Sequence, residues 1–283
     1  MTQHKMRLGG PTFNQYKDPA TWIAGLIEAG YSAAFAPVGP EADDATVRTY
    51  VDAAANAGIV IAEVGAWSNP ISPNNDERRA ALEKCIRQLA HAERIGARCC
   101  VNIAGARGPQ WDGPHPDNLT DATFDLIVET TRHIIDAVKP RRTFYTLETM
   151  PWMFPDSADS YLRLLHAIDR RQFAVHFDPV NLINCPSRYF QTGAFLRDCF
   201  AKLGAHIKSC HAKDIALAGK LTVHLDEVRP GLGALDYGVF LTELNRLDPD
   251  TPLMLEHLPN AEEYAAAAQH IRQVATEKGL AFR

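Results

Sequence analysis

The sequence predicts a single domain of the α/β class, a (β/α)8 or TIM barrel that spans residues 1–283. Helical segments and apolar strand-like segments alternate eight times, which is the order of elements in such a barrel. Three early helical segments end near Gly30, Gly58 or Gly96, and an apolar run follows each within a few residues. An open, doubly wound sheet is the alternative, but no Gly-x-Gly-x-x-Gly motif opens a helix.

The strands are predicted from short apolar runs that are rich in β-branched and aromatic residues. They fall at about residues 7–9, 31–38, 59–65, 98–103, 144–148, 173–178, 206–211 and 253–256. The helices are predicted from apolar residues at helical spacing and from capping residues at their starts. They fall at about residues 18–30, 43–56, 76–95, 124–138, 157–168, 190–203, 237–247 and 260–275. The last helix begins at Asn260, and Glu263 stands three residues later in capping-box position.

The composition is that of a folded globular domain. Hydrophobic residues make up 46% of the chain and charged residues 22%, which argues against disorder. A net charge of −5 gives no support for binding nucleic acid or an anionic membrane. The chain has no run of 18 apolar residues and no signal-peptide core after its first charged residues. We therefore expect a cytoplasmic protein, and the sequence leaves a homo-oligomer open.

Four consecutive predicted strands each end in a side chain that can bind a metal. These side chains are Glu148, Asp178, His211 and Glu256. A single carboxylate at a strand end is more often a helix cap or a salt-bridge partner. Four such groups on neighbouring strands, about 4.8 Å apart, can converge on one point, where their charges would repel without a cation. This oxygen-rich set predicts a divalent metal site, Mn²⁺ or Mg²⁺ rather than a structural zinc.

The motifs around these residues resemble a known group of barrels. The segments Leu147-Glu148, Phe177-Asp178-Pro179, His211-Ala212-Lys213-Asp214 and Leu255-Glu256, with the Gly-rich turn Pro230–Tyr237, resemble the xylose isomerase-like TIM barrel superfamily, in particular its sugar phosphate isomerase/epimerase family. The resemblance implies that the four strand-end residues bind one divalent ion, with Mn²⁺ first and Mg²⁺, Co²⁺ or Zn²⁺ as alternatives. It departs at Asn181, where many ketose epimerases of this group carry a histidine.

The resemblance and the residues together predict a metal-dependent sugar isomerase or epimerase. Glu148 and Glu256 are the expected catalytic residues: they move a proton next to a carbonyl, and the metal stabilises the enediolate. A lyase or dehydratase acting by β-elimination on a keto-sugar or keto-glycoside is the alternative, because it shares the first step. An endonuclease of the same superfamily is disfavoured, since the early strand ends offer Glu63 and Asn102 but no histidine. A non-catalytic barrel that keeps a structural metal is also left open.

Six further residues are candidates for contact with a carbohydrate substrate. They are Lys213, His176, Asn181, Trp111, Trp152 and Arg229. Alternation along the strands puts His176 one layer below Asp178 and Lys213 one layer above His211. The two tryptophans could form an aromatic wall for a sugar ring, or they could pack on neighbouring helices or a partner subunit.

Arg229 could bind a phosphate or carboxylate, or it could be an ordinary surface arginine. Glu63 is a further polar contact near the end of its strand, and Trp67 follows that strand as a weaker aromatic candidate. His257 should point away from Glu256 into the helix layer, because neighbouring strand residues face opposite sides.

Overall fold

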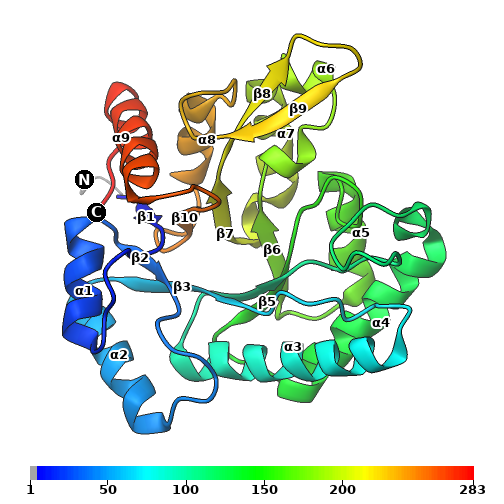
Figure 1. Cartoon of the computed structure of the whole chain (residues 1–283), viewed down its shortest axis with the longest axis horizontal. Helices are drawn as coiled ribbons and strands as arrows, with labels where there is room; N and C mark the ends of the chain where they lie inside the picture. Colours follow the sequence, from blue (N-terminus) through cyan, green and yellow to red (C-terminus); the bar gives the residue numbers. More distant parts are fainter. Residues whose placement is uncertain (1–4) are drawn as a thin grey trace.

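The computed structural model describes residues 5–283 and contains a closed barrel of eight parallel strands (Figure 1). Around the barrel the strands follow the order β1, β10, β7, β6, β5, β4, β3, β2. Their bounds are β1 Arg7–Gly9, β2 Ala33–Phe35, β3 Val60–Gly65, β4 Cys99–Asn102, β5 Phe144–Glu148, β6 Phe173–Phe177, β7 Ile207–Ala212 and β10 Pro252–Leu255. The predicted (β/α)8 barrel is therefore confirmed.

The helices surround the barrel (Figure 1). A side chain caps the N-terminus of most of them. Their bounds are α1 Pro19–Glu28, α2 Asp44–Asn56, α3 Asn75–Ile95, α4 Asp121–Val138, α5 Ala158–Ile168, α6 Pro186–Tyr189, α7 Thr192–Leu203, α8 Tyr237–Leu244 and α9 Ala261–Glu277. Asp18, Asp43 and Ser157, for example, each accept a hydrogen bond from the backbone N–H three residues later. Among the described residues, no helix is both long and apolar enough to cross a bilayer.

A β-hairpin after β7 is the one large element that the sequence did not predict. Its antiparallel strands, β8 Asp214–Ala218 and β9 His224–Val228, project above the barrel in Figure 1. The sequence predicts no strand between residues 212 and 229. The prediction failed because β9 is mostly exposed and lacks a sustained apolar alternation.

The main apolar core lies between the barrel and the helices. Alternate strand residues such as Leu147, Val175 and Cys210 belong to it, together with Leu164 and Leu196 from the helices. The strand residues between them face the opposite side, the barrel interior, because side chains alternate along a strand.

The barrel interior is unusually polar at β5, β6 and β7. Thr146, His176, Ser209 and His211 are all fully buried. Because a buried polar group is costly without a partner, these side chains must bond to each other or to something bound nearby.

Candidate active site and metal centre

The four strand-end residues converge at one end of the barrel. Glu148 is the last residue of β5, Asp178 follows β6, His211 is in β7 and Glu256 follows β10. Each offers one ligand-type atom, and these atoms all lie within 4.8 Å of one another. His211 Nδ1 lies 2.7 Å from an oxygen of Glu256 and 3.2 Å from one of Glu148. We call this group of four residues the strand-end cluster.

The chain around Asp178 leaves one of its oxygens free for the cluster. Asp178 Oδ1 accepts hydrogen bonds from the backbone N–H groups of Val180 (3.0 Å) and Asn181 (3.4 Å). The Thr149 hydroxyl accepts the Asp178 N–H and also contacts its carbonyl, which ties the strand end to β5. Oδ2 is therefore the atom that faces His211, at 3.8 Å, and Lys213, at 2.7 Å.

Lys213 brings a positive charge into the strand-end cluster. Its side chain is 2% exposed, and its Nζ lies 2.7 Å from Asp178 Oδ2 and 2.6 Å from Glu256 Oε1. Glu148 is 3.7 Å away. The sequence placed Lys213 one layer above His211 as a substrate contact, and the structure shows that it is first an ion-pair partner of the acids.

The excess of carboxylates dominates the electrostatics of the cluster. Burial acts against the charged forms of His211 and Lys213, but the acids outweigh it. Glu256 and Glu148 raise the pKa of His211, and Asp178 raises the pKa of Lys213. Burial alone would raise the pKa of Glu256, but His211 and then Lys213 lower it to about 2.

The cluster fits a divalent cation. Asp178 Oδ2 and Glu256 Oε1 are buried oxygens that lie within ion-pair distance of Lys213, yet neither accepts a hydrogen bond of normal geometry. Three carboxylates and one imidazole form a hard, oxygen-rich donor set. As a ligand of a metal ion His211 would be neutral, so the three carboxylates and the Lys213 ammonium would leave two negative charges, which matches the charge of a divalent ion.

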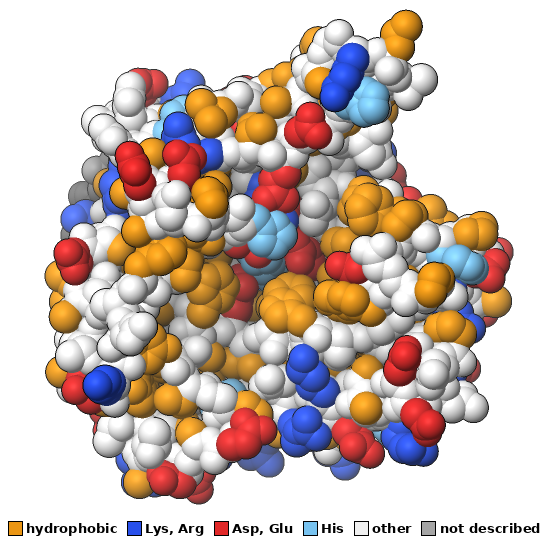
Figure 2. All heavy atoms as spheres, viewed as in Figure 1, with side chains coloured by type: hydrophobic (Ala, Val, Ile, Leu, Met, Phe, Trp, Pro, Cys, Tyr) orange, Lys and Arg blue, Asp and Glu red, His pale blue; other side chains and the backbone are white. Residues whose placement is uncertain are grey.

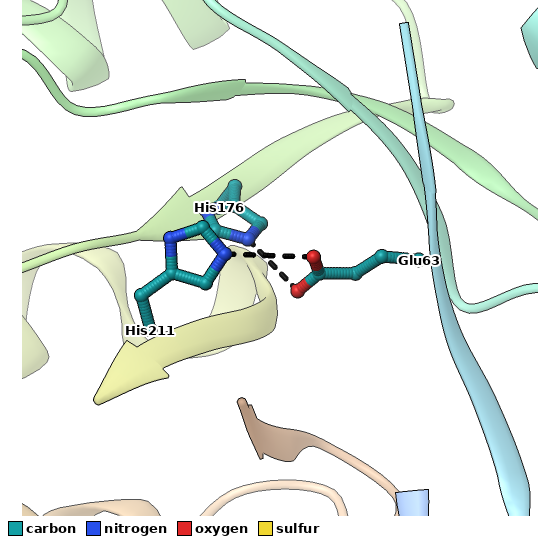
Figure 3. A group of neighbouring side chains, drawn as sticks. All are labelled: Glu63, His176 and His211. Carbon is teal, nitrogen blue, oxygen red and sulfur yellow. Dashed lines mark hydrogen bonds and ion pairs between the residues drawn. The ribbon is translucent and has the colours of Figure 1, made fainter. Parts of the chain in front are cut away.

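A second polar layer lies beneath the cluster and reaches the same histidine (Figure 3). Glu63, on β3, points across the barrel toward His176 and His211. Its Oε1 lies 2.9 Å from His176 Nε2 and accepts a short hydrogen bond from the Ser209 hydroxyl. Its Oε2 lies 3.5 Å from His211 Nε2. His211 therefore has a carboxylate within ion-pair distance of each ring nitrogen, although its Nε2 makes no hydrogen bond of normal geometry.

Glu63 has a larger role in this geometry than the sequence analysis gave it. Burial acts to raise the pKa of Glu63, but the rings of His176 and His211 hold it well below its usual range. The available signal was a single carboxylate inside the apolar run 59–65. His176 faces this lower layer, and it is not among the residues that line the pocket above.

A pocket of about 440 Å³ opens above the cluster, which we call the strand-end pocket. It is lined by Phe35, Trp67, Ile103, Trp111, Asp112, Glu148, Met150, Asn181, Lys213, Glu227, Glu256 and His257. In Figure 2 a hollow near the middle of the face shows acidic and histidine side chains beside a group of hydrophobic ones. Two larger hollows, one between α1 and α9 and one beside α5, contain none of the cluster residues.

His257 lies at this pocket, so the prediction that it would point into the helix layer is wrong. Its backbone has a φ of 58°, a left-handed conformation that breaks the alternation expected for a strand. Its Nδ1 lies 3.2 Å from Glu227, on the hairpin strand β9. Glu227 also lies 3.5 Å from Lys213, so the hairpin adds an acid to the site that the sequence did not reveal.

Asn181 and Trp111 both line the strand-end pocket. The Asn181 amide donates hydrogen bonds to Glu148 Oε1 (3.2 Å) and to the Thr149 carbonyl (3.0 Å), so it holds the Glu148 side chain. Trp67, the weaker aromatic candidate, lines the same pocket.

Trp152 and Arg229 lie outside the residues that line the strand-end pocket. The indole N–H of Trp152 donates to the backbone carbonyl of Asp112 at 2.7 Å, which ties two loops together. The Arg229 guanidinium is 2.8 Å from Glu263 of α9. Glu263 thus binds Arg229 and not the Asn260 backbone, and only the Asn260 half of the expected capping box is present.

Comparison with known proteins agrees with this architecture. Among solved structures, a xylose isomerase-like TIM barrel protein from Mycobacterium smegmatis in complex with magnesium has a TM-score of 0.68 and 15% identity, over 98% of this chain and 99% of that one. The probable 3-DHS dehydratase AsbF of Bacillus anthracis has a TM-score of 0.70 and 20% identity, over 96% and 98%. The 3-keto-D-glucoside 4-epimerase YcjR of E. coli has a TM-score of 0.68 and 14% identity, over 95% and 100%. No curated protein sequence matches the chain significantly.

The family model for xylose isomerase-like TIM barrels matches residues 24–274, which is most of the chain. The match spans every barrel strand except β1 and all four residues of the strand-end cluster. The chain therefore belongs to the xylose isomerase-like TIM barrel family.

Proposed function

We propose that this protein is a divalent-metal-dependent isomerase or epimerase of a keto-sugar or sugar derivative. The convergence of Glu148, Asp178, His211 and Glu256 beneath an open pocket is the observation that carries the proposal. Mn²⁺ is the ion that we expect, with Mg²⁺, Co²⁺ or Zn²⁺ as alternatives. The magnesium complex and the keto-glucoside epimerase among the solved structures of this fold support the proposed function.

Glu148 and Glu256 are the proposed proton carriers. A bound cation would polarise the substrate carbonyl and offset the charge that develops on its oxygen. Both carboxylates line the pocket, and they come from β5 and from the end of β10, so they reach a bound sugar from different sides. One would take the proton next to the carbonyl, and the other would return a proton.

Other residues would orient these groups and the substrate. Asn181 holds Glu148 through its amide, and Lys213 holds Asp178 and Glu256. The Lys213 ammonium has three donors, and it lines the pocket, so it could also donate to a substrate oxygen. Trp67 and Trp111 at the mouth would keep water away from the reacting atoms.

A lyase or dehydratase is the second candidate function. The residue at position 181 is the observation that favours it. Asn181 is a neutral amide, whereas many ketose epimerases of the group that the sequence resembles carry a histidine at this position. A β-elimination needs the same proton removal but a different second step, in which a leaving group departs. The dehydratase among the structural relatives supports this alternative.

A deuterium-exchange screen tests the proposal. The protein is purified without chelators, its metal content is measured, and keto-sugars are incubated with it in D₂O. We expect exchange of the proton next to the carbonyl, and product analysis then separates epimers from elimination products. Glu148→Gln and Glu256→Gln should each slow exchange by about 10²-fold or more, whereas Glu263→Gln, a carboxylate outside the pocket, should not.

Each variant also needs a metal measurement, because both glutamates are proposed ligands. Near-normal exchange in both glutamine variants with full metal occupancy would overturn the assignment of the proton carriers. A protein that binds no divalent ion would overturn the proposed function itself.

A further inference from the structure

The strand-end pocket is strongly acidic. Five carboxylates surround it or lie directly behind its floor: Asp112, Glu148, Asp178, Glu227 and Glu256. Among the described residues that line it, Lys213 is the single lysine or arginine, and Asp178 and Glu256 already pair with its charge. A divalent ion in the cluster and a charge on His257 would still leave negative charge in excess.

The Gly-rich turn after the hairpin is not available to bind an anion. The backbone N–H groups of Gly231, Gly233 and Leu235 all point at one group, as they would at a bound phosphate. That group is the Asp214 carboxylate, which accepts hydrogen bonds from them at 3.0, 3.1 and 2.9 Å. An internal carboxylate thus fills this anion cradle.

The arginine next to this turn is also engaged. Arg229 was the candidate to bind a phosphate, but its Nε lies 2.8 Å from Glu263. Its side chain is 20% exposed and is not part of the pocket lining. Both of these candidate phosphate-binding groups are therefore already paired with a carboxylate of the chain itself.

One wall of the pocket is apolar and aromatic. Phe35, Trp67 and Trp111 form it with Ile103 and Met150. The two tryptophans are 38% and 41% exposed, which is high for such large apolar side chains. An aromatic surface left open beside hydrogen-bonding groups is typical of a site for a ligand with one apolar face.

We propose that the strand-end pocket selects an uncharged keto-sugar and rejects sugar phosphates. The aromatic wall would contact the C–H face of the sugar, and the carboxylates would accept hydrogen bonds from its hydroxyls. A phosphate dianion has only acceptor oxygens, and it would meet an excess of carboxylates that Lys213 and a bound divalent ion do not fully balance. The keto group in this inference rests on the proposed function, whereas the selection by charge rests on the pocket alone.

Matched pairs of ligands test the selection. D-fructose and D-fructose 6-phosphate, and D-ribulose and D-ribulose 5-phosphate, are titrated into the Mg²⁺-loaded protein by calorimetry and tryptophan fluorescence. Ionic strength and free Mg²⁺ are held constant in every titration. We expect the uncharged member of a pair to bind about tenfold tighter or more, because charge repulsion acts on the phosphate ester only.

Three variants connect the result to the pocket. Trp111→Ala should weaken binding of the uncharged sugar by about tenfold, whereas Phe190→Ala, an exposed aromatic outside the pocket, should not. Glu227→Gln keeps the shape of the side chain and removes one charge. It should tighten binding of the phosphate ester by about threefold or more relative to binding of the uncharged sugar.

The outcomes separate this inference from the proposed function. Equal or tighter binding of either phosphate ester, or no saturable binding of either uncharged sugar, would overturn the selection by charge. Saturable binding of an uncharged sugar without exchange of its proton in D₂O would overturn the proposed function for that sugar and leave the selection standing. Exchange on phosphate esters alone would support the chemistry and overturn the selection.

Discussion

Lys213 Nζ lies 2.7 Å from Asp178 Oδ2, inside the group of acids that we expect to bind a cation. The same ammonium lies 2.6 Å from Glu256 Oε1. Lys213 could take the place of a metal ion only if its single positive charge balanced the negative charge of the three carboxylates. One positive charge is not enough to do so. One ammonium among three carboxylates leaves two charges to be balanced, so we expect Lys213 and a divalent ion to share the cluster.

The first prediction follows from this sharing. Lys213→Met removes the charge but keeps the length of the side chain. In the metal-free protein it should lower the free energy of unfolding by about 3 kcal/mol, because buried carboxylates lose the ammonium group that pairs with them. Saturating Mn²⁺ should then stabilise the variant more than it stabilises the original protein. Urea unfolding with EDTA and with Mn²⁺ measures both effects.

Lys208→Met is the matched control, because Lys208 lies over the Phe144 ring near the start of β7 and is not one of the cluster residues. It should change unfolding by the same amount with and without Mn²⁺. If Lys213→Met behaved in the same way, the ammonium would not be an electrostatic partner of a metal site.

The second prediction concerns the partner on the other side of His211. Glu63 Oε2 lies 3.5 Å from His211 Nε2, and a carboxylate behind a ligand histidine fixes its ring and tautomer. Glu63→Gln should therefore weaken Mn²⁺ binding by about tenfold or more. Electron paramagnetic resonance of free Mn²⁺ gives the dissociation constant without any assay of activity.

His91→Gln is the control for this variant, because His91 is also buried but contacts the Val38 carbonyl on the outer side of the barrel. It should leave Mn²⁺ affinity unchanged. An unchanged Mn²⁺ affinity in Glu63→Gln would mean that the lower polar layer fills the barrel interior and does not support metal binding by His211.

The barrel could be predicted from the sequence because its signals are local. The run 144–148 is bounded like the observed β5, and the glycines after the early helices mark their ends. Each of these signals depends only on residues that are close in the sequence, so the strands and helices can be predicted without knowing any long-range contacts. The hairpin β8–β9 could not be predicted in this way, since its second strand, β9, is mostly exposed and buries little apolar area.

The strand-end cluster could be predicted for a related reason. In a parallel barrel the carboxyl ends of all strands lie at one end, so Glu148, Asp178 and Glu256 had to lie near each other. The position of Glu227 depends on how the hairpin folds back, and that of His257 depends on a left-handed backbone. Neither follows from spacing along the chain.

The third prediction concerns the seam between β5 and β6, directly under the cluster. The Tyr161 hydroxyl, from α5, accepts the N–H groups of Leu147 (3.1 Å) and His176 (3.3 Å) and can donate to Leu147 or Ala174 carbonyls. Tyr161→Phe leaves these buried groups short of a partner. It should lower the free energy of unfolding by about 2 kcal/mol, measured by urea unfolding.

The same change tests how rigidly the seam supports Glu148, the residue after Leu147. A small shift of the β5 end should also weaken Mn²⁺ binding. Tyr189→Phe, a partly buried tyrosine on α6, should alter neither quantity. If Tyr161→Phe were as stable as the original protein, water or the strands themselves would satisfy the backbone groups that lost the tyrosine hydroxyl.

The last prediction is a pH dependence away from the active site. The Glu93 carboxylate, on α3, accepts backbone N–H groups of Arg141, Arg142 and Thr143 at 3.1, 2.9 and 3.1 Å. Partial burial acts to raise the pKa of Glu93, but these three donors and the charge of Arg142 lower it. The carboxylate thus binds protons less readily in the folded state than in the unfolded state.

Because the folded pKa is the lower one, Glu93 stabilises the fold fully above the unfolded value of about 4.3 and loses this effect as pH falls through the folded value. Glu93→Gln should therefore cost on the order of 1 kcal/mol at pH 7, and the difference in stability between the two proteins should shrink as the pH is lowered toward about 3. Urea unfolding between these two pH values tests this, with Glu129→Gln, an exposed carboxylate of α4, as the control. A constant difference across the range would show that the three N–H donors do not distinguish the charged carboxylate from a neutral amide.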